Sequence, residues 1–209
     1  MRSFRIMLVL LGTLLGLAGP AQSQQKIVVG FCCLPFGFTD AKSGQPAGYS
    51  VEVMNAIAKD QGLTLEYKAV TFSEALQGLV AKQTDIIAAH LAITDQRRAI
   101  GVEFSRPYVR YAEGLIVAAA DGGAYHKVDD LKGEVVGAAA GSTYLAGMKT
   151  KTGFKEVRAF TSTDDAVLAV AKGEVKGYVA NMALLAHTQR QGQLQGVRLV
   201  ETYQPEYPS

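Results

Sequence analysis

The sequence predicts an α/β protein with two lobes, each a βαβ sheet flanked by helices. Segments that look like strands and helices alternate through the first half of the chain, and the same alternation returns in the second half. This repeat favours two similar lobes over one continuous sheet. The first lobe is expected at residues 24–110 and the second at residues 111–201, with residues 202–209 starting a return crossing to the first lobe.

The first half carries a strand pattern at residues 26–31 and then a helix pattern at residues 50–61. Gly62 follows this helix, where a left-handed C-cap is expected. The apolar residues recur at helical spacing and predict one buried face. That face consists of Val51, Met54, Ile57 and Ala58.

A second helix is predicted after the alternating strand at residues 63–70. Thr71 and Glu74 have the T-x-x-E spacing of a capping box, which marks the start of a helix. A buried strand at residues 85–89 completes the first βαβ unit. The residues expected to face inward on this second helix are Leu76, Leu79 and Val80.

The second half repeats this order. Gly141-Ser142-Thr143 is expected to open one helix, and Thr161 to cap another that ends at Gly173 and buries Ala166, Val167 and Val170. When Thr71 is aligned with Thr161, Glu74 meets Asp164, which supports two similar lobes. Strands are expected at residues 113–119, which link the lobes, and at 134–138, 156–160 and 177–180.

A signal peptide is predicted at residues 1–23. Arg2 and Arg5 precede an uncharged apolar run, and small residues lead to Ser23, after which cleavage is expected. The run is too short to span a membrane comfortably, so we expect export to the periplasm. Removing this segment leaves equal numbers of basic and acidic residues, and no basic surface indicates nucleic-acid binding.

Cys32 and Cys33 are adjacent, and two interpretations stay open. They could be two small apolar residues near a buried strand end. Alternatively, they could form a vicinal or an intermolecular disulfide, as a cysteine pair in an exported protein suggests. Neither interpretation supplies a catalytic thiol.

Several enzyme and cofactor classes lack sequence support. The chain has no G-x-S-x-G motif, and its histidines, His90, His126 and His187, are scattered. Neither H-E-x-x-H nor C-x-x-C is present to bind a metal. The stretch "GAAAGSTY" lacks the Gly-Lys pair of a phosphate loop. We therefore expect no cofactor and no metal.

Anion recognition is the chemistry that the sequence supports. Thr94 can cap a helix start, where the helix dipole favours negative charge, and Arg97 adds a planar fork suited to a carboxylate. Gly141-Ser142-Thr143 offers a second helix N-terminus with two hydroxyls. The alternative interpretations are that Arg97 or Arg98 is a solvated surface charge and that Gly-Ser-Thr is a plain turn.

From Lys26 to its C-terminus, the chain resembles the periplasmic solute-binding proteins of amino-acid ABC importers. The similarity lies in "VGFCCLPFGFTD", "PAGYSVEVMNAIAKDQG", "TFSEALQGLVAKQTDIIAAHLAITDQRR", "FSRPYV", "LKGEVVGAAAGSTY" and "AVAKGEVKGYVANMALL". The resemblance implies a type II periplasmic-binding-protein fold that closes on its ligand like a hinge. Since the family returns to its first lobe, a chain ending at Ser209 is expected to be truncated there.

The resemblance also implies roles for individual residues. Arg97 matches the arginine that binds the ligand's α-carboxylate, with Arg98 as a reserve candidate. Phe72 matches the aromatic residue that stacks on the ligand, and Ser142 or Thr143 matches the second-lobe hydroxyl. The ligand-binding candidates are completed by Thr94, His90 and Phe36.

Two residues and one short segment depart from the family pattern. Asn181 stands where an acidic residue pairs with the ligand's ammonium, although its amide could still accept one hydrogen bond. Ala92 replaces a serine, and Cys32-Cys33-Leu34 stands where an aspartate and a stacking tyrosine are common. Because an ammonium buried without an anion is unfavourable, a standard α-amino acid is a less secure ligand than the family resemblance suggests.

The function that this resemblance implies is capture of an amino acid or related small carboxylate and its delivery to an ABC permease, by a monomer that is not an enzyme. One alternative is a periplasmic dehydratase of the same fold acting on prephenate or arogenate. Its acid or base would have to be His90 or Glu52. Another alternative is a module that senses the ligand without transporting it.

Overall fold

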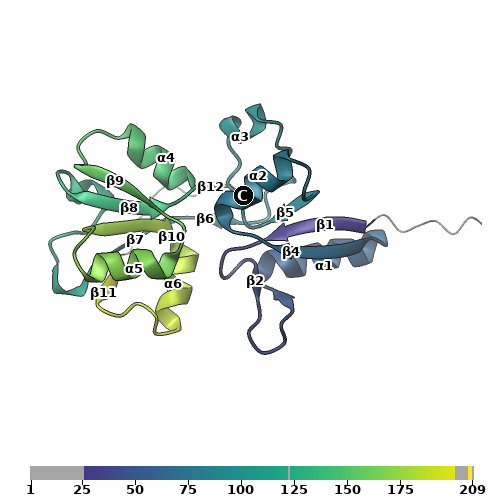
Figure 1. Cartoon of the computed structure of the whole chain (residues 1–209), viewed down its shortest axis with the longest axis horizontal. Coiled ribbons are helices and arrows are strands. Elements are labelled where there is room, and N and C mark those ends of the chain that lie inside the picture. The colour runs from purple at the N-terminus through teal and green to yellow at the C-terminus, as the bar shows by residue number, and fades with distance from the viewer. Residues whose placement is uncertain (1–25, 122, 201–206, 209) are drawn as a thin grey trace, which may run out of the picture.

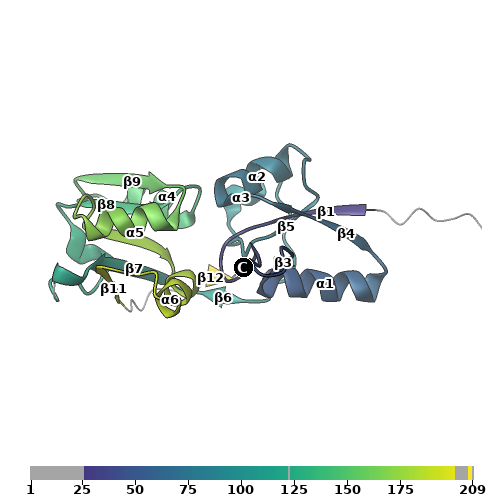
Figure 2. The ribbon, with the colours of Figure 1, turned by 60° about the horizontal axis from the view of Figure 1, so that its bottom comes forward.

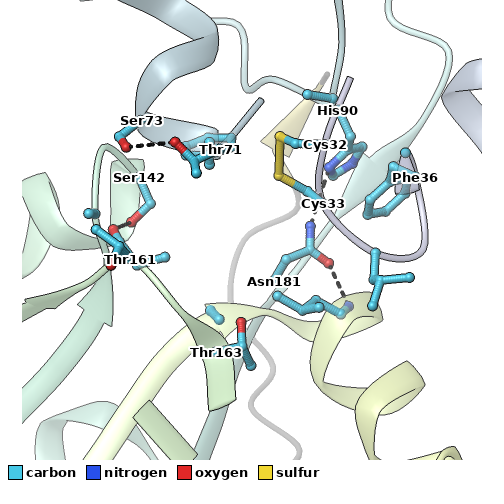
Figure 3. Close-up of a pocket in the computed structure, with 18 of the residues that line it drawn as sticks. Cys32, Cys33, Phe36, Thr71, Ser73, His90, Ser142, Thr161, Thr163 and Asn181 are labelled. Atoms are coloured by element: carbon cyan, nitrogen blue, oxygen red, sulfur yellow. Dashed lines mark hydrogen bonds between the residues drawn. A yellow bond between two sulfur atoms is a disulfide. The ribbon is translucent and has the colours of Figure 1, made fainter. Parts of the chain in front are cut away.

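The computed structural model describes residues 26–121, 123–200 and 207–208. Two α/β lobes lie side by side, joined by short strands that cross between them (Figure 1, Figure 2). They face each other across a cavity to which both contribute (Figure 3). The predicted signal peptide, residues 1–23, lies outside the described residues. Within the described part, no helix has the length and apolar composition needed to cross a membrane.

The first lobe is built on a three-stranded sheet with the order β4-β1-β5, in which both pairs are parallel as predicted. One face of this sheet packs against α1, and α2 lies across the other (Figure 1, Figure 2). The elements are β1 (Lys26–Phe31), β2 (Phe38–Thr39), β3 (Pro46–Ala47), α1 (Tyr49–Gln61), β4 (Thr64–Ala69), α2 (Phe72–Val80), β5 (Ile86–Ala88) and α3 (Asp95–Ala99).

The second lobe is built on a five-stranded sheet with the order β11-β7-β10-β8-β9. Its β8, β9 and β10 run parallel, whereas β7 pairs antiparallel with β10 and with β11. The elements are β7 (Glu113–Ala118), η1 (Ala119–Asp121), η2 (Val128–Leu131), β8 (Val135–Ala139), α4 (Thr143–Thr150), β9 (Glu156–Phe160), α5 (Thr163–Ala171), β10 (Gly177–Asn181), α6 (Met182–Arg190) and β11 (Val197–Val200).

The connection between the lobes contains a short antiparallel pair. Strand β6 (Arg110–Tyr111) leads into the second lobe and pairs with β12 (Tyr207–Pro208). Both strands lie between the lobes (Figure 1). The boundaries that the sequence suggested for the two lobes and for the return crossing stay predictions.

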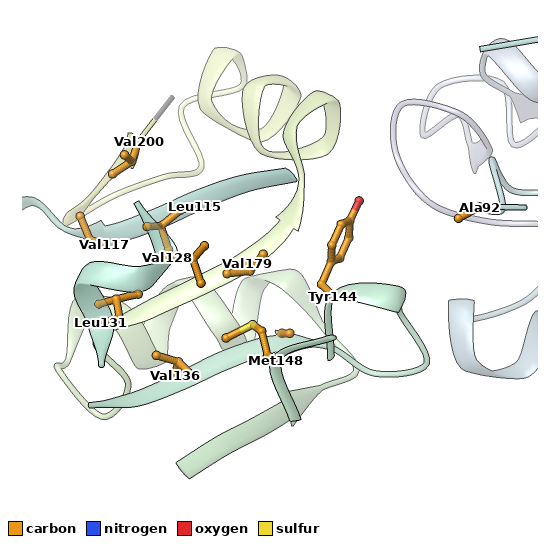
Figure 4. Close-up of a cluster of buried hydrophobic side chains, with 11 residues drawn as sticks. Ala92, Leu115, Val117, Val128, Leu131, Val136, Tyr144, Met148, Val179 and Val200 are labelled. Carbon is orange, nitrogen blue, oxygen red and sulfur yellow. The ribbon is translucent and has the colours of Figure 1, made fainter. Parts of the chain in front are cut away.

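The larger core belongs to the second lobe and occupies both faces of its sheet. Along β7, Leu115 and Val117 face one apolar cluster with α4, while Ile116 faces a second cluster with α5 and α6. This alternation follows from the period of two in a strand. In the first cluster, Leu131 and Met148 cover the sheet, and Tyr144 lies at the end of the lobe that faces Ala92 of the first lobe (Figure 4).

Local sequence signals placed most helix ends correctly. Gly62 has φ 64 and caps α1 in the left-handed conformation. The Thr71 Oγ1 accepts a hydrogen bond from the Glu74 backbone N–H at 3.3 Å, and the Glu74 carboxylate accepts one from the Thr71 N–H at 2.8 Å. This is the reciprocal capping box that the sequence predicts.

Three local predictions were wrong. Ile57 is 44% exposed, because a position six residues after Val51 rotates out of the buried stripe. Val80 is 53% exposed, since Ala75 and Gly78 set the buried side of α2. The cap of α5 is Ser162 rather than Thr161, with its Oγ accepting a hydrogen bond from the Asp165 N–H at 3.3 Å.

Candidate functional site

A cavity of about 500 Å³ lies between the two lobes (Figure 3). It is lined by the carboxyl ends of β1, β4 and β5 in the first lobe and of β8, β9 and β10 in the second, and by the starts of α2, α4, α5 and α6. Open α/β sheets bind their ligands at this edge. The predicted site residues that line the cavity are Phe36, Phe72, His90, Ala92, Arg97, Ser142, Thr143 and Asn181.

Thr94 is the predicted site residue that does not line the cavity. Its Oγ1 accepts a hydrogen bond from the Arg97 backbone N–H at 3.3 Å and so caps the short helix α3. The expected capping role is present, but the hydroxyl turns toward its own helix and not into the cavity. Thr94 therefore positions Arg97.

Arg97 is a buried cation at the boundary of the lobes, with 6% of its surface exposed. Its Nη1 donates to the Ala92 carbonyl at 2.7 Å, and its Nη2 donates to the Gly141 carbonyl of the second lobe at 3.4 Å. The guanidinium carbon lies 5.9 Å from the centre of the Phe72 ring, within cation–π range. Two lobes and an aromatic face thus fix the orientation of one positive charge.

The neighbouring Arg98 takes the other role that the sequence left open. It is exposed, and its guanidinium lies over the Phe104 ring at 5.2 Å. Arg98 does not line the cavity. Two adjacent residues of α3 are therefore a buried cation and a solvated one.

The start of α4 forms the second-lobe side of the cavity, opposite α2. The Ser142 Oγ accepts a hydrogen bond from the Leu145 N–H at 3.1 Å and donates to the Ala139 carbonyl at 2.6 Å, so this hydroxyl serves the helix cap. Gly141 precedes it with φ 74, and a Cβ there would lie 3.4 Å from the Ser73 Cα. Glycine at this position lets the backbones of the two lobes approach closely.

His90 and Asn181 form a second contact between the lobes. The Asn181 Nδ2 lies 3.3 Å from the His90 Nδ1 (Figure 3). The Asn181 Oδ1 accepts hydrogen bonds from the N–H groups of Ala183 and Leu184 at 2.8 and 3.4 Å and thereby caps α6. This oxygen, which the sequence interpretation offered to a ligand ammonium, is turned toward the helix.

Phe36 and the cysteine pair give the first-lobe wall an apolar character. The Phe36 ring stacks on the His90 ring with centroids 3.9 Å apart. Cys32 and Cys33 form a disulfide with each other and line the cavity beside these rings (Figure 3). Of the two interpretations of the cysteines, the structure has the vicinal disulfide.

Sequence reasoning missed several hydroxyl groups of the cavity. Thr71 and Ser73 begin α2, and Thr161 and Thr163 follow β9; all four line the cavity (Figure 3). Their position at the carboxyl ends of parallel strands was a usable signal. Tyr178 is a further lining residue that reasoning from the sequence did not identify.

The structure does not bring the candidate dehydratase residues together. His90 lines the cavity, whereas Glu52 lies exposed on α1 and is not among the lining residues. Within the described residues, no group of three or more His, Cys, Asp and Glu side chains is arranged to hold a metal ion.

The His90 imidazole makes folding stability dependent on pH. Burial lowers the pKa of His90 from 6.5 to about 4. Below pH 6.5 the unfolded chain takes up a proton that the folded protein binds only near pH 4, so stability falls as pH falls through this window. One pKa unit corresponds to about 1.4 kcal/mol, so we expect a loss on the order of 3 kcal/mol between pH 7 and pH 4.

Denaturant unfolding at a series of pH values measures this loss. The His90→Asn variant is the control, because asparagine does not titrate and tolerates the positive φ of 54 at this position. If His90→Asn lost stability as steeply as the wild type between pH 6.5 and 4, His90 would not be the group responsible.

The fold and the placement of the cavity define a two-lobed binding protein, and comparison with known proteins identifies the family. The model of the bacterial extracellular solute-binding proteins, family 3, matches residues 27–198. The chain belongs to this family.

Individual relatives agree with this assignment. The probable amino-acid-binding protein YxeM of Bacillus subtilis (strain 168) is 30% identical over 172 residues, which cover 81% of this chain and 64% of YxeM. The arginine-binding periplasmic protein of Mannheimia haemolytica is 28% identical, over 87% of this chain and 73% of that protein. The match to YxeM therefore spans less than two thirds of that relative's length.

A solved structure supports the same fold. An ancestral arginine-binding protein bound to glutamine superposes with a TM-score of 0.77 at 29% sequence identity. The match covers 88% of this chain and 81% of that chain.

Proposed function

We propose that this protein captures an amino acid or a related small carboxylate in the cavity between its lobes and delivers it in the periplasm to the permease of an ABC importer. The observation that carries the proposal is the buried Arg97 guanidinium in the wall of that cavity. A planar guanidinium can bind a carboxylate through two parallel hydrogen bonds. Similarity to arginine-binding proteins supports a ligand of this class.

The start of α4 supports a two-sided grip on the carboxylate. Ser142, Thr143 and Tyr144 line the cavity at the N-terminus of this helix. The helix dipole places partial positive charge there, which favours an anion. Arg97 from one lobe and α4 from the other would then hold one carboxylate between them.

Closure of the two lobes is the expected consequence of binding. The contacts of Arg97 with Gly141 and of Asn181 with His90 cross the boundary through long hydrogen bonds of 3.4 and 3.3 Å. Shifting a mostly open population to a mostly closed one takes about 5.5 kcal/mol of differential affinity. Charge-assisted hydrogen bonds contribute about 1.5–3 kcal/mol each. A carboxylate that is bound by both lobes could therefore supply this differential affinity for the closed state.

A binding and closure experiment tests this proposal. Calorimetry with a panel of amino acids, 2-oxo acids and simple carboxylates is expected to identify a ligand that binds in a 1:1 ratio. Small-angle scattering should then show a smaller radius of gyration at saturation. Uptake of that ligand by cells with and without the gene separates transport from sensing. Failure of every carboxylate in the panel to bind would contradict the proposal.

A further inference from the structure

We propose that the preferred solute is a monocarboxylate with an apolar body and no ammonium group next to the carboxylate. This inference rests on the proposed function and names the ligand class of the same cavity. Its basis is the distribution of charge among the described residues that line the cavity. These residues provide a buried cation for a carboxylate but no buried anion for an ammonium.

Arg97 is the fixed positive charge of the cavity wall, and it is buried. Among the described lining residues, Asp164 is the one carboxylate, and it is exposed in the first turn of α5. Glu113 pairs with Asn181 in the strand register but does not line the cavity. If Arg97 binds the ligand's carboxylate, an ammonium group next to that carboxylate would therefore lose its hydration without gaining a buried anionic partner.

The His90 and Asn181 side chains, which meet across the boundary of the lobes, do not replace that anion. The Asn181 Oδ1 already accepts two backbone hydrogen bonds at the start of α6, and its Nδ2 faces the His90 Nδ1. This arrangement makes Nδ2 the donor and Nδ1 the acceptor. His90 is stacked on Phe36, and burial keeps its pKa near 4, so it is neutral at pH 7.

The remaining wall suits an apolar body. Phe36, Phe72, Phe160 and Tyr178 line the cavity together with the Cys32–Cys33 disulfide. Burial raises the pKa of Tyr178 to about 12, so its phenol is uncharged at pH 7. Aromatic rings and a disulfide favour an aliphatic or aromatic side group over an ionic one.

Matched pairs of ligands test the inference directly. Calorimetry at pH 8 would compare 3-phenylpropanoate with phenylalanine and 4-methylpentanoate with leucine, since each pair differs only by the α-ammonium. Arginine, with two cationic groups, completes the panel. We expect each ammonium-free acid to bind at least tenfold more tightly than its amino acid, and arginine to bind most weakly.

The Asn181→Asp variant tests the cause of this preference. Aspartate caps helices as well as asparagine does, so α6 should keep its start while a carboxylate enters the cavity. A carboxylate near His90 would raise the pKa of the histidine, and pH 8 keeps the imidazole neutral. We expect phenylalanine and leucine to gain at least tenfold in affinity and the ammonium-free acids to lose affinity.

Gln189→Glu is the matched control, because it adds one negative charge on the exposed end of α6 outside the cavity. It should leave the order of affinities unchanged. Tighter binding of the amino acids by the wild-type protein, or no gain for them in Asn181→Asp, would overturn the inference and leave the proposed function standing. If none of these acids and no member of the wider carboxylate panel bound, the proposed function itself would fail.

Discussion

Replacing Arg97 with alanine is expected to weaken carboxylate binding by roughly 100- to 10,000-fold. Two charge-assisted hydrogen bonds contribute about 1.5–3 kcal/mol each, and every 1.4 kcal/mol corresponds to a tenfold change in affinity. The variant leaves the ligand carboxylate in a cavity lined by aromatic rings with no cation beside it. Titration calorimetry with the ligand found in the screen measures this loss.

Two further variants separate charge, geometry and folding. Arg98→Ala removes an exposed charge one residue away and should leave affinity within about twofold of wild type, as is usual for surface charges. Arg97→Lys keeps the charge but loses the planar fork, so affinity should fall between those of wild type and Arg97→Ala. Arg97→Ala also loses the bond to the Ala92 carbonyl, so its melting temperature must be measured alongside. Unchanged affinity in a folded Arg97→Ala protein would remove Arg97 from the site.

The preference for Arg97 over Arg98 came from the family resemblance, whereas the start of the helix that carries both could be predicted from the residues alone. Thr94 fixes the start of α3, and a residue three positions into a capped helix has a defined direction. The Thr71–Glu74 capping box and the Gly62 cap are local signals of the same kind. Periodicity predicted the parallel strands of both lobes but not β11 or the antiparallel pairing of β7. The resemblance to the solute-binding family, and not local signals, supplied most of the predicted residues that line the cavity.

The role of Asn181 shows why the rest of the candidate site could not be predicted from the sequence. An asparagine at the end of a strand can either offer its oxygen to a ligand or cap the next helix, and both roles have the same sequence pattern. The choice depends on where His90 of the other lobe meets its amide group. Contacts of this kind, like the approach of Gly141 to Ser73, depend on how the lobes are oriented.

Replacing Gly48 with alanine is expected to destabilise the first lobe by several kcal/mol and to weaken ligand binding at least tenfold. Gly48 is the N-cap of α1, with φ 112 and ψ 163, a conformation that residues with a Cβ rarely adopt and that carries about 1–3 kcal/mol of strain. A Cβ would also lie 2.5 Å from the Phe36 carbonyl oxygen and 2.9 Å from that of Pro35. Both contacts are with backbone, so the loop itself would have to move.

That movement would reach the cavity, because the start of α1 holds the loop in place. The Ser50 N–H donates to the Phe36 carbonyl at 2.8 Å, and the Phe36 ring stacks on His90 in the cavity wall. Gly44→Ala is the matched control: Gly44 also has a positive φ, 68, but a Cβ there would meet no atom within 4 Å. The Gly44→Ala protein should lose only about 1–2 kcal/mol of unfolding free energy and keep its affinity for the ligand. Denaturant unfolding compares the stability of the two variants. If Gly48→Ala and Gly44→Ala lost equal stability, backbone conformation, and not contact with the Pro35–Phe36 loop, would explain the requirement for glycine at position 48.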